Sequence, residues 1–476
     1  MVSKPQAWAH SLGARTTIAD RAANLASAGA MGLVRRLRAA KPKRAGKLGW
    51  GTVAAMGWLL LGLPAWGQSG AASPSMPPLT VAALYAAAKQ THPLLQAARL
   101  EAQAGAIDVA AVERQRWPTL SAVVESDTGS PSAPPSHSLR VQQIVWDGGL
   151  VSSRVTEAQN QVIISKLRVE LQQRQLFLQI TSAWQAMLAA HARVQVAQKT
   201  MDRLKVYKDQ MQRRVDAEAA SRIDLVLATS RQLQTQVELD SAQRNLKVAL
   251  LKLEQLSGES NLRQRLPSLA PFPGLPQAAP FIDQLQQTDW VDVATRAPAV
   301  QIALGDVASA RNRLRSKEAE RWPQLYVRLD LPLGNNYLNA SNSVVAFAGL
   351  SYAPGAGFAN FVEAQALSTR VNKSAQGVEA AMKEAEDSLQ SDREEFINAY
   401  AQITALEKSV AGSDAVLASF ERQFQANRKT WLDLLNQVRE LAQNEYALVD
   451  AQASLVGARL RLELHMATNT TTAEQP

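Results

Sequence analysis

The stretch Arg116-Trp117-Pro118-Thr119-Leu120 returns 205 residues later as Arg321-Trp322-Pro323-Gln324-Leu325. Each copy follows a segment that opens with a proline, Pro93 or Pro298, at the same distance before the tryptophan. After each copy the sequence changes from a helical to an alternating pattern, passes a Gly-rich corner and becomes helical again over a long stretch. Self-similarity at a fixed spacing indicates a tandem duplication. The repeated unit is predicted to be helix, strand, strand, helix, helix.

The alternating segments predict two pairs of strands. They cover residues 117–126, 139–146, 324–331 and 343–352, and polar loops at 127–138 and 335–342 join the members of each pair. In the first strand Leu120, Ala122 and Val124 share one side. About ten residues suffice for a tilted strand to cross a bilayer, and one apolar face suits a barrel with lipid outside and water inside. Strands of a soluble sandwich are the alternative, because alternation by itself is a weak signal.

Two long segments predict helical hairpins. Residues 150–257 contain neither Gly nor Pro, and residues 358–466 contain no Pro. Apolar residues recur in them at spacings of three and four, which indicates coiled-coil-like packing. Breaks are expected near 217–221, where Ser221 can cap a new helix, and at 427–430. Each long leg would extend roughly 100 Å.

The formal net charge of +9 comes entirely from residues 1–67, which hold ten Lys or Arg and one acidic residue. The rest of the chain is balanced, which argues against a nucleic-acid partner. Basic residues, an apolar run at 48–63 and Ala65-Trp66-Gly67 predict a secretory signal peptide cleaved before Gln68. A transmembrane anchor is the alternative, but the run is shorter than the ~20 residues that a spanning helix needs. The start is either Met1 or Met31.

Catalytic chemistry finds no support in the sequence. There is no cysteine, and the five histidines are scattered without metal-ligand spacing. The glycines of Gly355-Ala356-Gly357 lack the third glycine and the βαβ context of a dinucleotide loop. The prediction is therefore a chain that is not an enzyme and holds neither metal nor cofactor.

These patterns divide the chain into five parts. They are a signal peptide at 1–67, a first repeat at 79–257, a linker at 258–287, a second repeat at 288–467 and a polar tail at 468–476. Four strands cannot close a membrane barrel, since open edges are not tolerated in lipid and the smallest barrels have about eight strands. The chain is therefore expected to oligomerise, and three copies would supply twelve strands.

Over residues 79–466 the chain resembles the TolC-like family of outer-membrane channel proteins. The resemblance is carried by the two Arg-Trp-Pro motifs, by Trp146-Asp147-Gly148-Gly149, and by the paired hairpin tips at 221–225 and 430–434. It implies a mainly α fold with transmembrane β: a homotrimer whose 12-stranded outer-membrane β-barrel continues into a periplasmic α-helical barrel.

The resemblance also implies a function and partners. Such channels are exit ducts recruited by a periplasmic adaptor and an inner-membrane ABC transporter or RND-type pump. The corner at 351–357 looks most like the branch that serves type I secretion of large adhesins. The outer-membrane component of a multidrug efflux pump is the alternative, and a periplasmic coiled-coil scaffold without a pore is the rival from another class.

In this family the tips of the two hairpins close the periplasmic end of the channel. The matching positions are Asp224 on the first tip and Phe424, Lys429 and Asp433 on the second. Lys429 stands where the family usually has Arg, and Phe424 where the best-known pattern has Tyr. Both changes predict a weaker closed state, because Lys lacks the bidentate fork and Phe lacks a hydroxyl. The alternative is that the two aspartates only stabilise helix N-termini.

Two further groups of residues follow from the resemblance. The adaptor-docking tips often carry Val-Gly in the family, whereas this chain has Ala217-Glu218 and Ala426-Asn427, which argues against a drug-efflux adaptor. A membrane-interface girdle is expected from four aromatic residues where strands meet helices: Trp117, Trp146, Trp322 and Tyr352. Plain packing at these junctions is the alternative.

Overall fold

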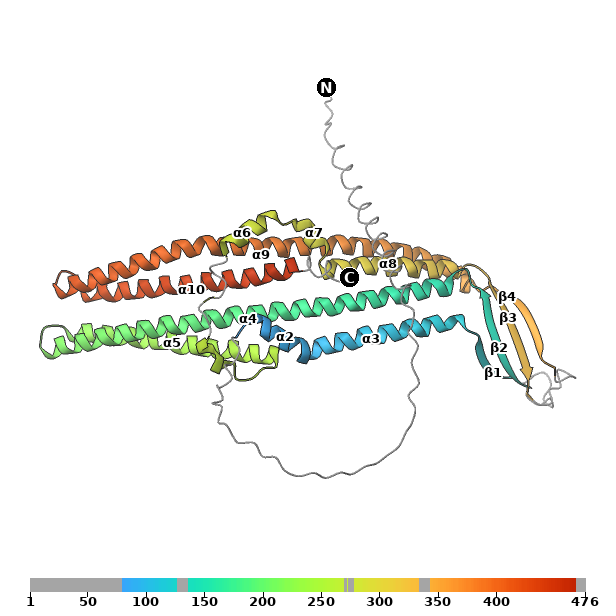
Figure 1. Cartoon of the computed structure of the whole chain (residues 1–476), viewed down its shortest axis with the longest axis horizontal. Helices are drawn as coiled ribbons and strands as arrows, with labels where there is room; N and C mark the ends of the chain where they lie inside the picture. Colours follow the sequence, from blue (N-terminus) through green and yellow to red (C-terminus); the bar gives the residue numbers. More distant parts are fainter. Residues whose placement is uncertain (1–78, 126–135, 269–271, 273–277, 334–342, 468–476) are drawn as a thin grey trace, which may run out of the picture. The chain divides into compact units, whose positions relative to one another are not determined.

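The structure is a computed structural model that describes residues 79–125, 136–268, 272, 278–333 and 343–467. All of them belong to one compact unit that begins at Met76. Its helices run side by side, with four strands at one end and the tips of two helical hairpins at the other (Figure 1). The predicted signal peptide, both predicted inter-strand loops over most of their length and the predicted tail lie outside the described residues.

The first half of the unit contains six helical segments and two strands. In chain order they are α2 (Val81–Thr91), α3 (Pro93–Glu113), η1 (Arg114–Arg116), β1 (Thr119–Glu125), β2 (Ser136–Trp146), α4 (Leu150–Asp216), α5 (Arg222–Ser257) and η2 (Leu262–Ser268). The predicted break between the long helices is confirmed. Ser221 caps α5, since its hydroxyl accepts a hydrogen bond from the Ile223 amide.

The second half contains the corresponding elements after two short helices. They are α6 (Ala278–Gln287), α7 (Trp290–Thr295), α8 (Pro298–Ala319), β3 (Gln324–Pro332), β4 (Val345–Ser351), η4 (Ala356–Phe358), α9 (Ala359–Gln425) and α10 (Trp431–Ala467). Helices α4 and α9 each have 67 residues. At 1.5 Å per residue each is roughly 100 Å long.

The four strands form one antiparallel sheet in the order β1-β2-β3-β4. Strands β2 and β3 come from different halves of the chain, and their register pairs Leu139 with Leu331 and Arg140 with Asp330. Strand β2 begins at Ser136, so the loop expected at 127–138 ends earlier than predicted. The reason is that the ladder with β1 continues to Ser136, and the Leu333 amide also bonds the His137 carbonyl.

The two faces of the sheet differ as the alternation predicts. Leu120 on β1, Val327 on β3 and Leu350 on β4 share one face and are 71%, 42% and 67% exposed. On the other face Arg140 pairs with Asp330 at 3.0 Å, and Arg328 lies beside the same carboxylate. The apolar face is therefore uncovered within one chain, while the polar face holds its own charge network.

The segment at 258–287 is more than a linker, contrary to the prediction. It contains η2 and all of α6, whose Phe281 and Leu285 are buried against α9 and α10. Pro280 does not prevent this helix, because it occupies the first turn, where no intrahelical N–H donor is required. The Pro- and Gly-rich composition hid the short amphipathic helix at its end.

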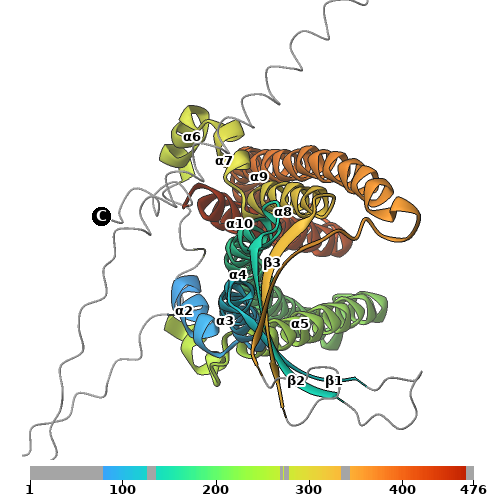
Figure 2. The same ribbon diagram turned by 90° about the vertical axis from the view of Figure 1, so that its right-hand side faces the viewer.

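Long helices pack against each other and against the short ones. Helix α3 lies along α4, and α8 fits between α4 and α9 (Figure 2). Gly305 of α8 permits this approach, because a Cβ there would stand 2.7 Å from Cγ1 of the buried Ile164. A core around Trp184, Met187 and Leu253 fixes the first hairpin against α2. This packing sets where the hairpin tips end relative to the sheet.

Both tips are Schellman motifs of the same geometry. After α4 the Glu218 and Ala219 amides donate to the carbonyls of Val215 and Arg214, and after α9 the Asn427 and Arg428 amides donate to those of Phe424 and Gln423. The pattern needs a left-handed residue, and here these are Glu218 with φ 56° and Asn427 with φ 57°. Glycine is the usual residue at such a position.

Glu218→Gly should therefore raise the free energy of unfolding, by up to about 1 kcal/mol, since glycine adopts this conformation without strain. Calorimetric melting of the purified protein measures the effect. Ala219→Gly is the matched control, because Ala219 has no positive φ and glycine there only adds freedom to the unfolded chain. Equal shifts for the two variants would contradict the strain at Glu218.

Candidate functional site

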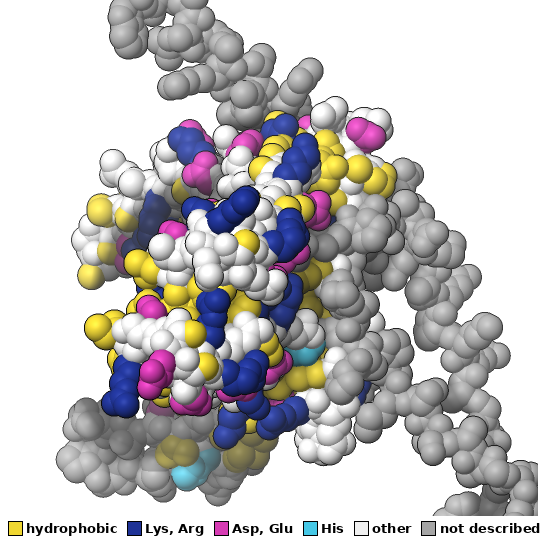
Figure 3. Space-filling view, turned by 90° about the vertical axis from the view of Figure 1, so that its left-hand side faces the viewer, with side chains coloured by type: hydrophobic (Ala, Val, Ile, Leu, Met, Phe, Trp, Pro, Cys, Tyr) yellow, Lys and Arg dark blue, Asp and Glu magenta, His cyan; other side chains and the backbone are white. Residues whose placement is uncertain are grey.

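The candidate site is the end of the unit at which the two hairpin tips lie side by side. Viewed from that end, hydrophobic side chains occupy a band between the two hairpins, and Lys and Arg side chains stand around it (Figure 3). A buried cluster with members from all four long helices joins the hairpins just behind their tips: Leu204, Tyr207, Met211, Ala228, Leu417, Trp431, Leu434, Leu435, Val438 and Leu441.

Trp431, the first residue of α10, is the central residue of this cluster. Its side chain is 4% exposed, and its ring packs against Tyr207 at 6.1 Å and Phe424 at 5.3 Å between centroids. Its indole Nε1 donates a hydrogen bond of 3.1 Å to the carbonyl oxygen of Asp224. One side chain thus holds the first turn of α5 to the first turn of α10.

Arg214, in the last turn of α4, makes a second link. Its guanidinium lies over the ring of Phe424, 4.6 Å from the centroid, which is a cation–π geometry. Its Nη2 also donates to Oδ1 of Asn427 at 3.4 Å. Phe424 has no hydroxyl group, as the sequence indicates. Within the chain its aromatic ring makes the contact with Arg214.

Tyr207 of α4 and Glu421 of α9 form a third link. The Tyr207 hydroxyl donates to the Glu421 carboxylate in a short hydrogen bond. Burial, and then this carboxylate, raise the pKa of Tyr207, so the phenol stays protonated at any physiological pH. The Tyr207 hydroxyl therefore remains a hydrogen-bond donor to Glu421.

Asp433 and Thr430 form a capping box at the start of α10. The Asp433 amide donates to the Thr430 hydroxyl at 3.2 Å, while the Asp433 carboxylate accepts from the Thr430 hydroxyl at 2.8 Å and from its amide at 3.2 Å. These hydrogen bonds from Thr430 lower the pKa of Asp433, and Lys429 adds a smaller effect. The alternative role of Asp433, stabilising a helix N-terminus, is thus present in the chain.

Lys429 pairs within its own chain with Asp433, at 4.0 Å, and its Nζ lies 4.4 Å from the centre of the Phe420 ring. It does not pair with Asp224 inside the chain. Asp224 lies in the first turn of α5 and contributes its backbone carbonyl to Trp431. The structure thus brings Asp224 and Phe424 together through Trp431, and Lys429 together with Asp433.

Arg214 and Trp431 were not among the residues predicted for the site. The sequence held one signal for Trp431, which follows Thr430 in the stretch that matches 221–225, where Arg222 follows Ser221. A tryptophan at this position supplies a large ring that can pack against neighbouring side chains. Arg214 had no such signal, because it is one of many charged residues on α4.

The predicted docking positions occupy the outermost turn of each tip. Ala217 and Ala426 are the C-caps of α4 and α9, Glu218 and Asn427 are the left-handed residues after them, and all four are exposed. They form two equivalent surfaces on one chain. Their part in docking stays a prediction.

The predicted girdle residues lie where strands meet helices, at the other end of the unit. All four are exposed, with Trp117 at 71%, Trp146 at 49%, Trp322 at 61% and Tyr352 at 48%. A large part of each side chain is thus uncovered by the rest of its own chain, and the membrane-interface girdle stays a prediction. None of the helices among the described residues carries an apolar stretch that could span a membrane.

Solved structures share this arrangement of helices and strands. A membrane protein from Pseudomonas aeruginosa is 17% identical with a TM-score of 0.71, covering 81% of this chain and 90% of that one. The outer membrane protein VceC from Vibrio cholerae is 14% identical with a TM-score of 0.70, covering 81% and 95%. The CmeC outer membrane channel from Campylobacter jejuni is 11% identical with a TM-score of 0.63, covering 87% and 95%. The fold is thus that of TolC-like outer-membrane channels.

The sequence supports the same class. Residues 84–259 match the family model described as outer membrane efflux protein. A comparison with curated proteins found no match. The family match lies within the first half of the unit, and together with the shared fold it confirms the predicted resemblance to TolC-like channels.

Trp431→Phe should loosen the tips, because it keeps a ring in the cluster but removes the hydrogen bond to the Asp224 carbonyl. The loss of one such part-buried hydrogen bond costs about 0.5–1.5 kcal/mol. We expect a lower melting temperature and more frequent openings in planar lipid bilayers. Trp290→Phe is the control, since its Nε1 bonds the Leu285 carbonyl at 3.2 Å, far from the tips. If Trp290→Phe raises the opening frequency as much, the effect is not specific to the tips.

Proposed function

We propose that the protein is an outer-membrane exit duct of a tripartite export system. One observation carries the proposal: a sheet with an uncovered apolar face stands at one end of helices that are 67 residues long. Lipid would cover that face, and the helices would extend through the periplasm. The matched family model supports this reading.

The proposal includes assembly as a homotrimer. Strands β1 and β4 are the edges of the sheet and have no further strand partner among the described residues. Unpaired backbone N–H and C=O groups are not tolerated in hydrocarbon, so these edges require a neighbouring chain. Three copies would close a twelve-stranded barrel, and the hairpins below it would form the helical wall.

The exposed aromatics fit this placement. Trp117, Trp146, Trp322 and Tyr352 would lie at the periplasmic interface of the barrel, where amphipathic rings are favoured. The inter-strand loops would then face the cell exterior and the hairpin tips the inner membrane. At the tips, an adaptor would dock on the surfaces at Ala217-Glu218 and Ala426-Asn427.

The partner we propose is a type I secretion ABC transporter with its adaptor, exporting a protein substrate. Support comes from the corner at 351–357 and from the absence of Val-Gly at the tips. Co-purification of the trimer with its inner-membrane partners tests this. Recovery of an RND-type pump instead would assign the protein to multidrug efflux, and recovery from a soluble periplasmic fraction would favour the scaffold.

The lipid-facing side of the sheet is testable with one new charge on each face. Val327→Glu places a carboxylate on the apolar face and should abolish heat-resistant trimers in membrane extracts, because three charges would enter lipid. Gln142→Glu is the matched control, since Gln142 pairs with Arg328 on the polar face. Loss of trimers in both variants, or in neither, would contradict the assignment of faces.

The gate is testable through charge reversal. If Lys429 meets Asp224 of a neighbouring chain, Lys429→Glu should raise single-channel conductance, and adding Asp224→Lys should partly restore closure. One exposed pair contributes under about 1 kcal/mol, but three symmetry-related pairs act together. Lys429→Gln is the control, because Lys429 also pairs with Asp433 within its chain. Unchanged conductance in an intact trimer would place the gate elsewhere.

A further inference from the structure

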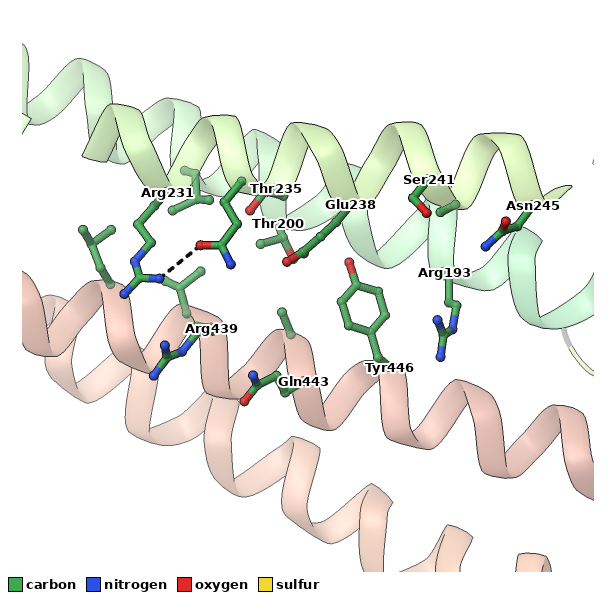
Figure 4. A pocket seen from close by; sticks show the side chains of 16 residues that line it. Arg193, Thr200, Arg231, Thr235, Glu238, Ser241, Asn245, Arg439, Gln443 and Tyr446 are labelled. Carbon is green, nitrogen blue, oxygen red and sulfur yellow. Dashed lines mark hydrogen bonds between the residues drawn. The ribbon is translucent and has the colours of Figure 1, made fainter. Parts of the chain in front are cut away.

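A polar groove of about 340 Å³ lies between α5 and α10, with α4 as its floor. It is lined by residues 231–245 of α5, 435–446 of α10 and 193–204 of α4 (Figure 4). It begins nine residues after the start of α5 and borders the cluster around Trp431, because Leu204, Leu435 and Val438 of that cluster also line the groove. None of the predicted gate or docking residues lines it.

Two arginines enter the groove from opposite walls. Arg231 belongs to α5 and Arg439 to α10, and their side chains extend toward the same end of the groove (Figure 4). Neither forms an ion pair with a carboxylate of the described chain. Arg231 donates from Nη1 to Gln234 Oε1 at 3.2 Å, and its Nε is buried without a hydrogen-bond partner. The third arginine, Arg193, is different because Asp450 already neutralises it.

The groove offers little of its own to balance these two cations. Glu238 is the only carboxylate among the lining residues. It lies seven positions from Arg231 on the same helix, which is roughly 10 Å along the axis. Burial raises the pKa of Glu238, so its charged form is disfavoured there. Among the described residues no ion pair joins Glu238 to Arg231 or Arg439, so neither arginine has a carboxylate partner in the groove.

Uncharged side chains that can donate hydrogen bonds also line the groove. The Tyr446 hydroxyl is buried and has no hydrogen-bond partner, and burial raises the pKa of Tyr446 to about 12, so it keeps its proton. The amides of Gln234 and Gln443 also line the groove. Apart from the Gln234 oxygen that accepts from Arg231, no lining group is hydrogen-bonded to the two guanidinium groups among the described residues.

We propose that this groove binds a small oxyanion, a phosphate or carboxylate group held between Arg231 and Arg439. Arg231 is half-buried, Arg439 is exposed, and both line the same groove, so an oxyanion bound there would accept charge-assisted, fork-like hydrogen bonds from both guanidinium groups. Because Arg231 belongs to one hairpin and Arg439 to the other, the bound anion ties α5 to α10. The ligand would thus stabilise one arrangement of the hairpins.

The experiment measures anion-dependent melting of the purified protein in detergent. Inorganic phosphate and citrate are titrated separately against chloride at constant ionic strength, which distinguishes a phosphate from a carboxylate ligand. We expect a saturable rise in melting temperature with one of them. Arg231→Gln and Arg439→Gln should each weaken the apparent Kd at least about tenfold, as expected for loss of a charge-assisted bond.

Two matched variants make the result specific. Arg244 lies on the same helix but does not line the groove, and its Nε donates to the Asp240 carbonyl oxygen. Arg244→Gln therefore removes a positive charge from outside the groove and should leave the Kd unchanged. Glu238→Gln removes the competing carboxylate and should strengthen binding. All variants must melt normally in chloride and keep the oligomeric state of the unsubstituted protein, which shows that they fold.

The proposal is overturned if neither anion gives a saturable shift, which would also be the result if a neighbouring chain fills the groove. It is equally overturned if Arg244→Gln weakens the effect as much as Arg231→Gln, since general charge screening would then explain it. These outcomes are independent of the proposed channel function, because melting is measured without transport.

Discussion

The pairing of β2 with β3 is the constraint on which the rest of the structure depends. It joins strands from the two halves of the chain and sets Arg140 opposite Asp330. Because side chains alternate, a slip of one residue would turn the apolar residues of β3 to the polar face. The helices that follow β2 and precede β3, α4 and α8, then pack against each other, with Gly305 against Ile164. One register thus fixes the direction in which both hairpins leave the sheet.

At the far end a different kind of interaction holds the chain. The tips are joined by a buried tryptophan, a cation–π contact and a phenol–carboxylate hydrogen bond, which link α4 and α5 to α9 and α10. Surface ion pairs such as Lys429–Asp433 add little to such a core. The two hairpins of one chain are therefore held together mainly by packing, and charges are left over for contacts with other molecules.

Arg231 and Arg439 belong to those remaining charges. Elsewhere along the long helices, charges that meet between hairpins are paired, as with Arg193 and Asp450 or Lys199 and Glu445. The groove between α5 and α10 lies beside those pairs, but its Arg231 and Arg439 have no such carboxylate partner among the described residues. The proposed oxyanion would supply the negative charge there.

The sequence by itself determined the features that depend on local order. Alternation of apolar and polar residues predicted the two faces of the strands, and the lack of Gly and Pro predicted the long helices. Ser221 predicted where α5 begins. The same logic failed at α6, where Pro-rich composition masked a short helix. Only the tertiary structure decided that Trp431 bonds Asp224, and that Arg231 and Arg439 share a groove. These partners lie more than 200 residues apart, and their meeting depends on how the helices pack, which no local period encodes.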